Sequence, residues 1–221
     1  MLIDSTYFVG KRFIPNLNEP DVNNRLGCDL ELLINHVEES VLSSIFGVAM
    51  WLDFKAKYQD KDNVPLSDEY KNIVEGCSYE FEGNAYYWDG LIQEDKKTSL
   101  LADLVYYEFK RENATLTTEI GESTINLKAG ESASNLPKMV YAYNSFIDKC
   151  FGNFAGNADG YTLEGNPFWF FNNGSVDFYG MNRINEKVSL VQFLYDNKSD
   201  YLILKFNFDK MNIESKNIFG I

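Results

Sequence analysis

Two stretches, TSLLADLVYYEF at residues 98–109 and LPKMVYAYNSFIDKC at residues 136–150, decide the fold of this chain. In the first, Thr98 is placed to cap a helix that carries an apolar stripe. In the second, Pro137 lies near the first turn, where a missing N–H costs little. In the first stretch the apolar residues are Leu101, Leu104 and Val105, with Glu108 on the next turn; in the second stretch they are Met139, Val140, Tyr143, Phe146, Ile147 and Cys150. The sequence therefore predicts two amphipathic helices.

The residues between these helices have a different pattern. From about residue 113 to residue 133, weakly apolar and polar residues alternate around Gly121. Alternation is typical of extended chain, and a two-stranded ribbon is only marginally stable in water unless it packs on something. We therefore expect an extended arm or loose hairpin here, and we expect it to need a partner.

The rest of the chain predicts further helices before residue 88 and a mixed region after residue 152. Asp29 is a plausible N-cap for a helix that runs to Gly47, and a second helix follows from Val48. Ser67 is placed to cap a short helix, and residues 78–88 have the alternation of a hairpin. After residue 152, many glycines, asparagines and aromatic residues indicate short strands and turns, with one helix at 188–196 and a strand at 202–208.

These patterns define the expected fold class. It is mostly α: a helical bundle with an extended arm or hairpin between the last two long helices, plus a small mixed α/β C-terminal region. The expected organisation is a helical body over residues 1–152, which includes the arm at about 113–133, and a mixed docking region over residues 153–221.

Charge and composition exclude several classes of function. With 33 acidic and 20 basic residues the formal net charge is −13, which argues against specific DNA binding, because that binding depends on cationic side chains. No apolar run reaches the length of a membrane helix, and the first residues lack the features of a signal peptide. We therefore expect no membrane association, and synthesis in a reducing cytoplasm. Three widely spaced cysteines indicate neither a disulfide framework nor a metal site.

The sequence offers little material for catalysis. His36 is the single histidine, so a triad or zinc site that needs two histidines is excluded, and its helical position indicates a partly exposed residue. The segments that begin at Gly121 and Gly130 lack the second glycine of a nucleophile elbow, and no phosphate-binding glycine motif occurs. We therefore expect no enzymatic activity, no catalytic, cofactor-binding or metal-binding residue, and no cofactor.

The order of the elements resembles the head-to-tail connector proteins (adaptor or neck ring proteins) of tailed bacteriophages. It is most similar to the connectors of crAss-like and other Bacteroidales phages. The resemblance spans nearly the whole chain and is a pattern of hydrophobic and turn residues. It is carried by Trp88-Asp89-Gly90-Leu91, Ser99-Leu100-Leu101-Ala102 with Tyr106-Tyr107, Thr115 to Gly121, Lys138-Met139-Val140 with Ala142-Tyr143-Asn144, the opening Ile3-Asp4-x-x-Tyr7-Phe8 and the closing Asn217-Ile218-Phe219-Gly220-Ile221.

The resemblance implies a virion structural protein, made in the bacterial host cytoplasm, that sits in the neck at the portal vertex. About twelve copies would form a ring that contacts the portal protein and adjacent neck or tail proteins, joins capsid to tail, and lets the genome DNA pass without specific binding. Exposed apolar ends of an arm and a tail are natural contact points. The expected subunit contacts are Ile120, Ile125 and Leu127 in the arm, and Ile218, Phe219 and Ile221 at the end of the chain.

Two alternatives from other classes stay open. A carbohydrate-active or other hydrolytic virion component would use two distant carboxyl groups, with the aromatic cluster near Trp169 as a sugar platform. A soluble acidic adaptor domain would bind one protein partner as a monomer. The hydrolytic alternative predicts a pocket that holds carboxyl groups of shifted pKa. The adaptor alternative predicts an arm that is ordered in isolation.

Overall fold

The computed structural model describes residues 1–14, 17, 25–112, 115–118, 121–124, 136–151 and 187–201, and this part of the chain is mostly helical. The helices are α1 (Arg25–Phe46), α2 (Val48–Gln59), α3 (Asp68–Glu75), α4 (Leu100–Glu112), α5 (Leu136–Phe151) and α7 (Leu190–Asp196), with 3-10 turns η1 (Ser5–Tyr7) and η2 (Gly10–Arg12). The strands form antiparallel pairs: β1 (Cys77–Phe81) with β2 (Asn84–Trp88), β3 (Ile92–Gln93) with β4 (Thr98–Ser99), and β5 (Thr115–Thr118) with β6 (Gly121–Thr124).

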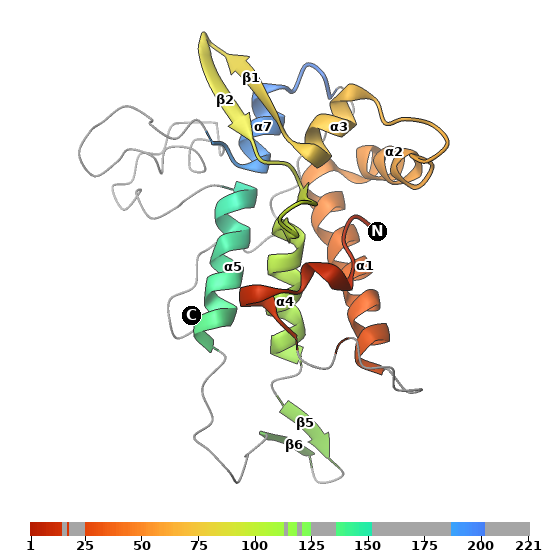
Figure 1. Ribbon diagram of the computed structural model, residues 1–221, viewed down its shortest axis with the longest axis vertical. Helices are drawn as coiled ribbons and strands as arrows, with labels where there is room; N and C mark the ends of the chain where they lie inside the picture. The colour runs from red at the N-terminus through yellow and green to blue at the C-terminus, as the bar shows by residue number, and fades with distance from the viewer. Residues whose placement is uncertain are drawn as a thin grey trace, which may run out of the picture.

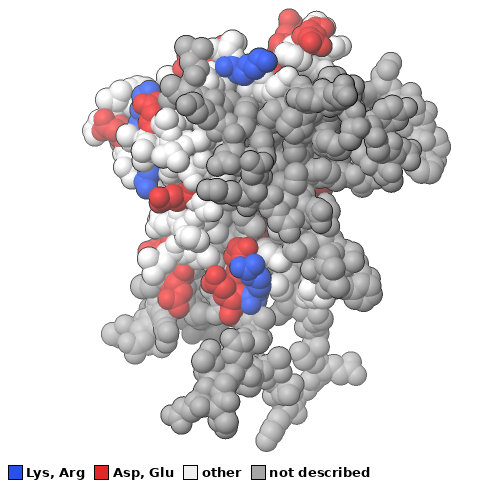
Figure 2. Space-filling model, turned by 180° about the vertical axis from the view of Figure 1, so that it is seen from behind, with Lys and Arg blue, Asp and Glu red and all other residues white. Residues whose placement is uncertain are grey.

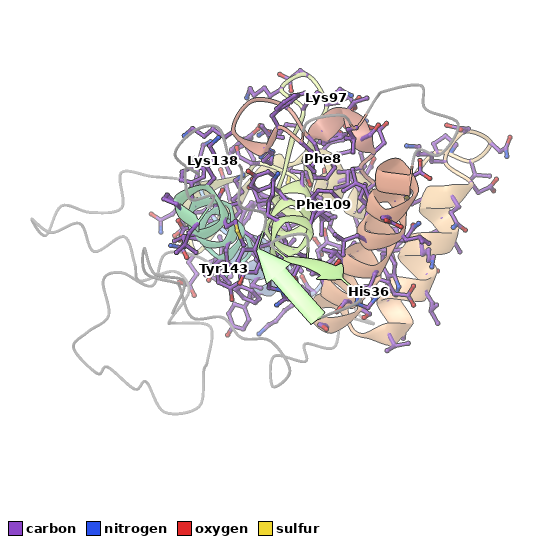
Figure 3. The ribbon with its side chains drawn as sticks, turned by 90° about the horizontal axis from the view of Figure 1, so that it is seen from below. Phe8, His36, Lys97, Phe109, Lys138 and Tyr143 are labelled. Carbon is purple, nitrogen blue, oxygen red and sulfur yellow. The ribbon has the colours of Figure 1, made fainter. Side chains whose placement is uncertain are left out.

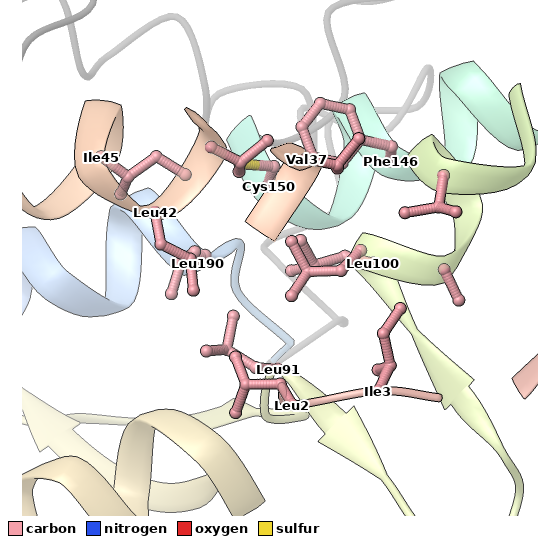
Figure 4. Close-up of a cluster of buried hydrophobic side chains, with 14 of the residues drawn as sticks. Leu2, Ile3, Val37, Leu42, Ile45, Leu91, Leu100, Phe146, Cys150 and Leu190 are labelled. Atoms are coloured by element: carbon pink, nitrogen blue, oxygen red, sulfur yellow. The ribbon is translucent and has the colours of Figure 1, made fainter. Parts of the chain in front are cut away.

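Three long helices, α1, α4 and α5, lie side by side with α4 in the middle (Figure 1). The predicted stripe is buried in part: Leu101 and Val105 are buried, whereas Leu104 and Glu108 are half-buried. Because α4 has a neighbour on each side, Leu100, Ala102 and Tyr106 are buried as well, each at most 2% exposed. The core continues into α7 and into the N-terminal segment, whose Leu2 and Ile3 lie close to the helices in Figure 4. Cys150 is fully buried in this core, as the sequence predicts for a small hydrophobe.

Two predicted helix starts are wrong. Helix α1 begins at Arg25 and not after Asp29, because Arg25 and Leu26 are themselves good helix formers. Helix α4 begins at Leu100, because Thr98 pairs with Gln93 in the β3–β4 ribbon and is held in a strand. The cap is Ser99, whose Oγ accepts the N–H of Leu101 at 3.1 Å.

Other boundaries agree with the sequence. The break between α1 and α2 falls at Gly47, which has a φ of 77° that favours glycine. The hairpin β1–β2 turns at Glu82 and Gly83, which both have positive φ (51° and 79°), as a tight two-residue hairpin turn requires. The expected second amphipathic helix is α5, and the expected helix at 188–196 is α7.

The described part of the C-terminal region packs on the helical body. The ring of Phe193 in α7 lies 6.0 Å from Trp88 and 5.4 Å from Tyr79, both on β1–β2. The N–H of Val188 donates to the carbonyl of Tyr87 at 3.0 Å, and α7 also contacts α5. The strand expected at 202–208 lies outside the described residues, and the division of the chain at residue 153 stays a prediction.

Candidate interaction surfaces

The hairpin β5–β6 lies between α4 and α5 in the sequence and apart from the helices in space. Figure 1 shows it beyond the ends of α4 and α5, and Figure 3 shows it over the end of α4, between α1 and α5. In the described part of the chain each of its strands pairs only with the other, with Thr115 opposite Thr124 and Thr118 opposite Gly121. Both outer edges are therefore open to a further strand or a partner surface in that part of the chain.

A groove of about 910 Å³ lies at the other end of the body, between the N-terminal segment, the α2–α3 region and the β3–β4 turn. Its apolar lining comes from Leu2, Ile3, Tyr7, Tyr58, Leu66, Val74 and Ile92, with Tyr87 of β2 at one side. Its charged lining comprises the carboxylates Asp4, Glu75, Asp89, Glu94 and Asp95 and the amines Lys61 and Lys96. Three of these carboxylates are ion-paired, Glu75 with Lys71, Asp89 with Lys187 and Glu94 with Lys97, so the margin of the groove is mixed in charge.

Two of the groove carboxylates, Asp4 and Glu94, have lowered pKa values. A hydrogen bond from Thr6 lowers the pKa of Asp4, and bonds from Lys97 and Tyr7 lower the pKa of Glu94. A general acid at neutral pH needs the opposite shift. Burial raises the pKa of Glu38 on α1 and of Asp148 on α5, but neither residue lines the groove. Neither Asp4 nor Glu94 therefore has the raised pKa that a general acid needs.

A buried ionic cluster centred on Asp103 of α4 fixes the N-terminal segment to the body. The Asp103 carboxylate accepts hydrogen bonds from Arg12 Nη1 at 2.6 Å, Lys149 Nζ at 2.6 Å and Ser145 Oγ at 2.9 Å. Arg12 belongs to η2, whereas Ser145 and Lys149 belong to α5. Because the Asp103 side chain is only 3% exposed, its charge is balanced by these partners and not by water. The cluster also holds one flank of the segment that lines the groove.

Glu38 provides a pH-dependent contact near the groove. Its carboxylate accepts the N–H of Leu2 at 2.9 Å, and burial raises its pKa above 4.5. An acid whose pKa is raised on folding contributes stability below its unfolded pKa, and this contribution is lost as pH rises through the folded pKa. We expect Glu38→Gln, which stays neutral, to gain stability relative to the wild type between pH 5 and pH 8. Urea unfolding at both pH values tests this, and Glu31→Gln, an exposed site on α1, should show no such gain.

The charges on the described surface are mixed in sign. On the face shown in Figure 2, acidic and basic side chains alternate over the described part, and no extended basic surface occurs among them. Nucleic-acid binding depends on such a basic surface. The surface agrees in this respect with the formal charge of −13.

Other chemistry is sparse in the part of the chain that the structure describes. His36 is exposed on α1, as the sequence predicts, and Figure 3 labels it on the outer side of the helices. Among the described residues, no group of three or more His, Cys, Asp or Glu side chains could hold a metal ion. No described helix is both long enough and apolar enough to cross a membrane.

The predicted contact residues cannot be placed. Ile120, Ile125, Leu127, Ile218, Phe219 and Ile221 all lie outside the described residues, so their roles stay predictions. The groove and the Asp103 cluster are features that the sequence analysis missed. Both are built from segments far apart in the chain, and Asp103 lies off the predicted apolar stripe, so the helical pattern contains no signal for its burial.

Comparisons with protein-family models, with curated proteins and with solved structures find no match for this chain. The described structure is a mostly helical body with a two-stranded hairpin beyond one end of its helices, and with a groove between the N-terminal segment, the α2–α3 region and the β3–β4 turn.

Proposed function

We propose that this chain is a structural protein of a tailed-bacteriophage virion that forms a ring at the portal vertex. The ring joins capsid to tail and leaves a passage for DNA. Its partners are copies of itself, the portal protein and adjacent neck or tail proteins. The observation that carries the proposal is the β5–β6 hairpin, which lies beyond the helices with open edges and acts as the arm of the connector-type bundle.

The placement of the two surfaces suits a closed ring. A ring needs a heterologous interface, in which one face of each subunit meets a different face of the next. The hairpin and the groove lie at different ends of the body, so they are different surfaces of one subunit. A permanent contact of this kind buries on the order of 2,000 Å² or more, and segments that become ordered on contact contribute to that area.

The charge distribution supports a passage role. A channel that conducts DNA must not retain it, and phosphate is repelled by carboxylates and bound by clustered amines. The net charge of −13 and the mixed signs in Figure 2 meet this requirement.

The hydrolytic alternative has less support. It requires two carboxyl groups in one pocket, one of which has a raised pKa. The described carboxyls with raised pKa, Glu38 and Asp148, lie on different helices, and Glu38 is engaged by the N–H of Leu2.

Electron microscopy of the purified chain, with and without portal protein, tests the proposal. We expect rings on the portal for the wild type, and we expect no rings when residues 113–133 are replaced by a glycine-serine linker. The free energy of unfolding should stay within about 1 kcal/mol of the wild type, because the hairpin lies apart from the helical core.

A control variant replaces the turn Glu82-Gly83 of the β1–β2 hairpin by Asn-Gly, which keeps the turn type and leaves the arm intact. This control should form rings on the portal. If the arm-deleted chain still forms rings, or if the wild type forms none with portal protein present, the proposal fails.

A further inference from the structure

Six of the nine large apolar side chains that are exposed in the described chain fall into two groups. Val9 and Phe13 flank η2, and Tyr141 of α5 lies beside it, with Lys11 Nζ of η2 at 4.3 Å from the centroid of the Tyr141 ring. The other three lie on α1 and α2, and each is more than half exposed. Apolar side chains grouped on a surface mark contacts with other molecules. The η2–α5 face consists of Val9, Lys11, Phe13, Lys138 and Tyr141, and the α1–α2 face consists of Glu31, Leu32, Glu39, Val48 and Leu52.

The exposed residues of α1 and α2 adjoin one another. On α1, Leu32 and Glu39 are two helical turns apart, so they lie on one side of the helix. Glu39 pairs with Lys55 of α2 at 3.6 Å. Lys55 follows Leu52 by three residues and Val48 by seven, so these three residues also share a side. The ion pair therefore joins the apolar residues of the two helices into one face.

The elements that carry the two faces have opposite charge. In η2, α4 and α5 together, six basic residues stand against four acidic ones, which gives +2. In α1 and α2 together, three basic residues stand against five acidic ones, which gives −2. No lysine or arginine occurs between Arg25 and Lys55, so the exposed Asp29, Glu31 and Glu39 of α1 face a single lysine. The α1–α2 face is therefore acidic.

The lysines of the η2–α5 face lack counter-charges in the described chain. Lys11 and Lys138 form no ion pair with any other described residue. Lys138 and Tyr141 are three residues apart on α5, so Lys138 lies on the side of the helix that Lys11 covers. Burial and the neighbouring Lys138 ammonium both lower the pKa of Lys110, as expected where positive charge is not balanced. The η2–α5 face is therefore basic.

The two faces lie on opposite sides of the body. Helix α4 lies between α1 and α5, and Figure 3 shows Lys138 and His36 on opposite sides of Phe109 of α4. His36 marks the exposed side of α1, since it follows Leu32 by four residues. The faces of one subunit cannot meet each other across α4. A second copy can meet both of them, because each face is complementary to the other.

We propose that the η2–α5 face of one copy binds the α1–α2 face of the next copy in the ring. This inference rests on the proposed function, because it names the contact between neighbouring copies. Exposed aromatic and aliphatic side chains form the centre of the contact, and lysines oppose carboxylates around it. Because the two faces differ, the contact is heterologous, and its repetition by rotation closes a ring.

Charge reversal on one face at a time tests the contact. Lys11→Glu/Lys138→Glu makes both faces acidic, whereas Glu31→Lys/Glu39→Lys makes both basic. All four side chains are exposed, so neither variant alters the core. We expect each variant alone to self-associate about tenfold more weakly than the wild type in sedimentation equilibrium, because like charges then meet at every contact. Neither variant alone should form rings on portal protein in electron microscopy.

An equimolar mixture of the two variants is the decisive measurement. In the mixture, the acidic face of one variant can bind the basic face of the other at every contact. Self-association should therefore return to within about threefold of the wild type, and rings on portal protein should reappear. Misfolded variants could not recover in this way, so the mixture separates loss of the contact from loss of the fold.

Two control variants make the same charge changes on exposed residues outside both faces. They are Lys96→Glu/Lys198→Glu and Glu80→Lys/Glu82→Lys, and both should assemble like the wild type. The inference is overturned if the controls assemble as poorly as the face variants, or if the mixture does not recover. It is also overturned if Lys11→Glu/Lys138→Glu forms rings but loses binding to a short duplex DNA, because the basic face would then bind nucleic acid.

The two assays separate this inference from the proposed function. Wild-type rings on portal protein that tolerate both reversals would overturn the inference and leave the proposed function standing. If the wild type forms no rings on portal protein, the proposed function fails. Sedimentation then decides the inference alone: self-association that is weak in each variant and recovers in the mixture supports the contact, and any other result overturns it.

Discussion

Gly90→Ala is expected to destabilise the protein by more than about 3 kcal/mol. Gly90 has a φ of 88°, and a Cβ there would lie 2.6 Å from the carbonyl oxygen of Val74 and 2.7 Å from the backbone nitrogen of Gly76. Both contacts are with backbone atoms, which cannot rotate away as a side chain can. The alanine therefore adds a steric clash to the conformational cost of a positive φ.

The clash cannot be relieved by a local shift, because the crossing of α3 and the end of β2 is fixed from both sides. Gly76 also has a positive φ, and a Cβ there would lie 2.3 Å from the carbonyl oxygen of Trp88. The carbonyl of Ile73 accepts two hydrogen bonds at this crossing, from Trp88 Nε1 and from the N–H of Leu91, each at 3.0 Å. Separating the two segments would break these buried bonds.

Gly83→Ala is the matched control. Gly83 has a φ of 79° but nothing lies within 4 Å of its missing Cβ, so only the conformational cost of about 1–2 kcal/mol remains. Urea unfolding monitored by tryptophan fluorescence measures both variants. Equal destabilisation by the two substitutions would contradict the close backbone approach at Gly90.

The sequence predicts the helices well because their signal is local. Of the six residues predicted to form one stripe, Val140, Tyr143, Phe146, Ile147 and Cys150 are buried in α5, and Met139 in its first turn is half-buried. Gly47 ends α1 where its conformational freedom indicates a break. In each case the residues that carry the signal are the residues that form the structure.

Features made by distant segments could not be predicted in this way. The start of α4 moves from Thr98 to Leu100 because Thr98 pairs with Gln93, and an amphipathic pattern contains no information on that pairing. Asp103 looks like a polar-face residue, but it is buried because Arg12 reaches it from η2. The groove combines residues from the N-terminal segment to Lys96, so no single sequence motif predicts it.

Asp103→Asn is expected to cost about 3–5 kcal/mol, because it leaves the buried guanidinium of Arg12 without its counter-charge. Asparagine keeps the shape of aspartate, so the loss comes from charge and not from a cavity. The Arg12 side chain is 13% exposed, and water cannot replace the carboxylate that lies 2.6 Å from its Nη1. We expect a fall in melting temperature of about 6–20 °C for a chain of this size.

The same substitution should release the N-terminal segment, because Asp103 ties η2 to α4 and α5. Limited trypsin digestion measures this directly, since Arg12, whose side chain is 13% exposed in the folded chain, becomes readily cleavable when η2 detaches. Lys149→Met is the matched control. Lys149 is 43% exposed, and Arg12 still balances Asp103 in its absence. The free energy of unfolding should therefore fall by only about 1 kcal/mol, one third of the Asp103→Asn effect or less. If Asp103→Asn melts with the wild type and resists cleavage at Arg12, apolar contacts such as those of Phe8 hold the segment instead.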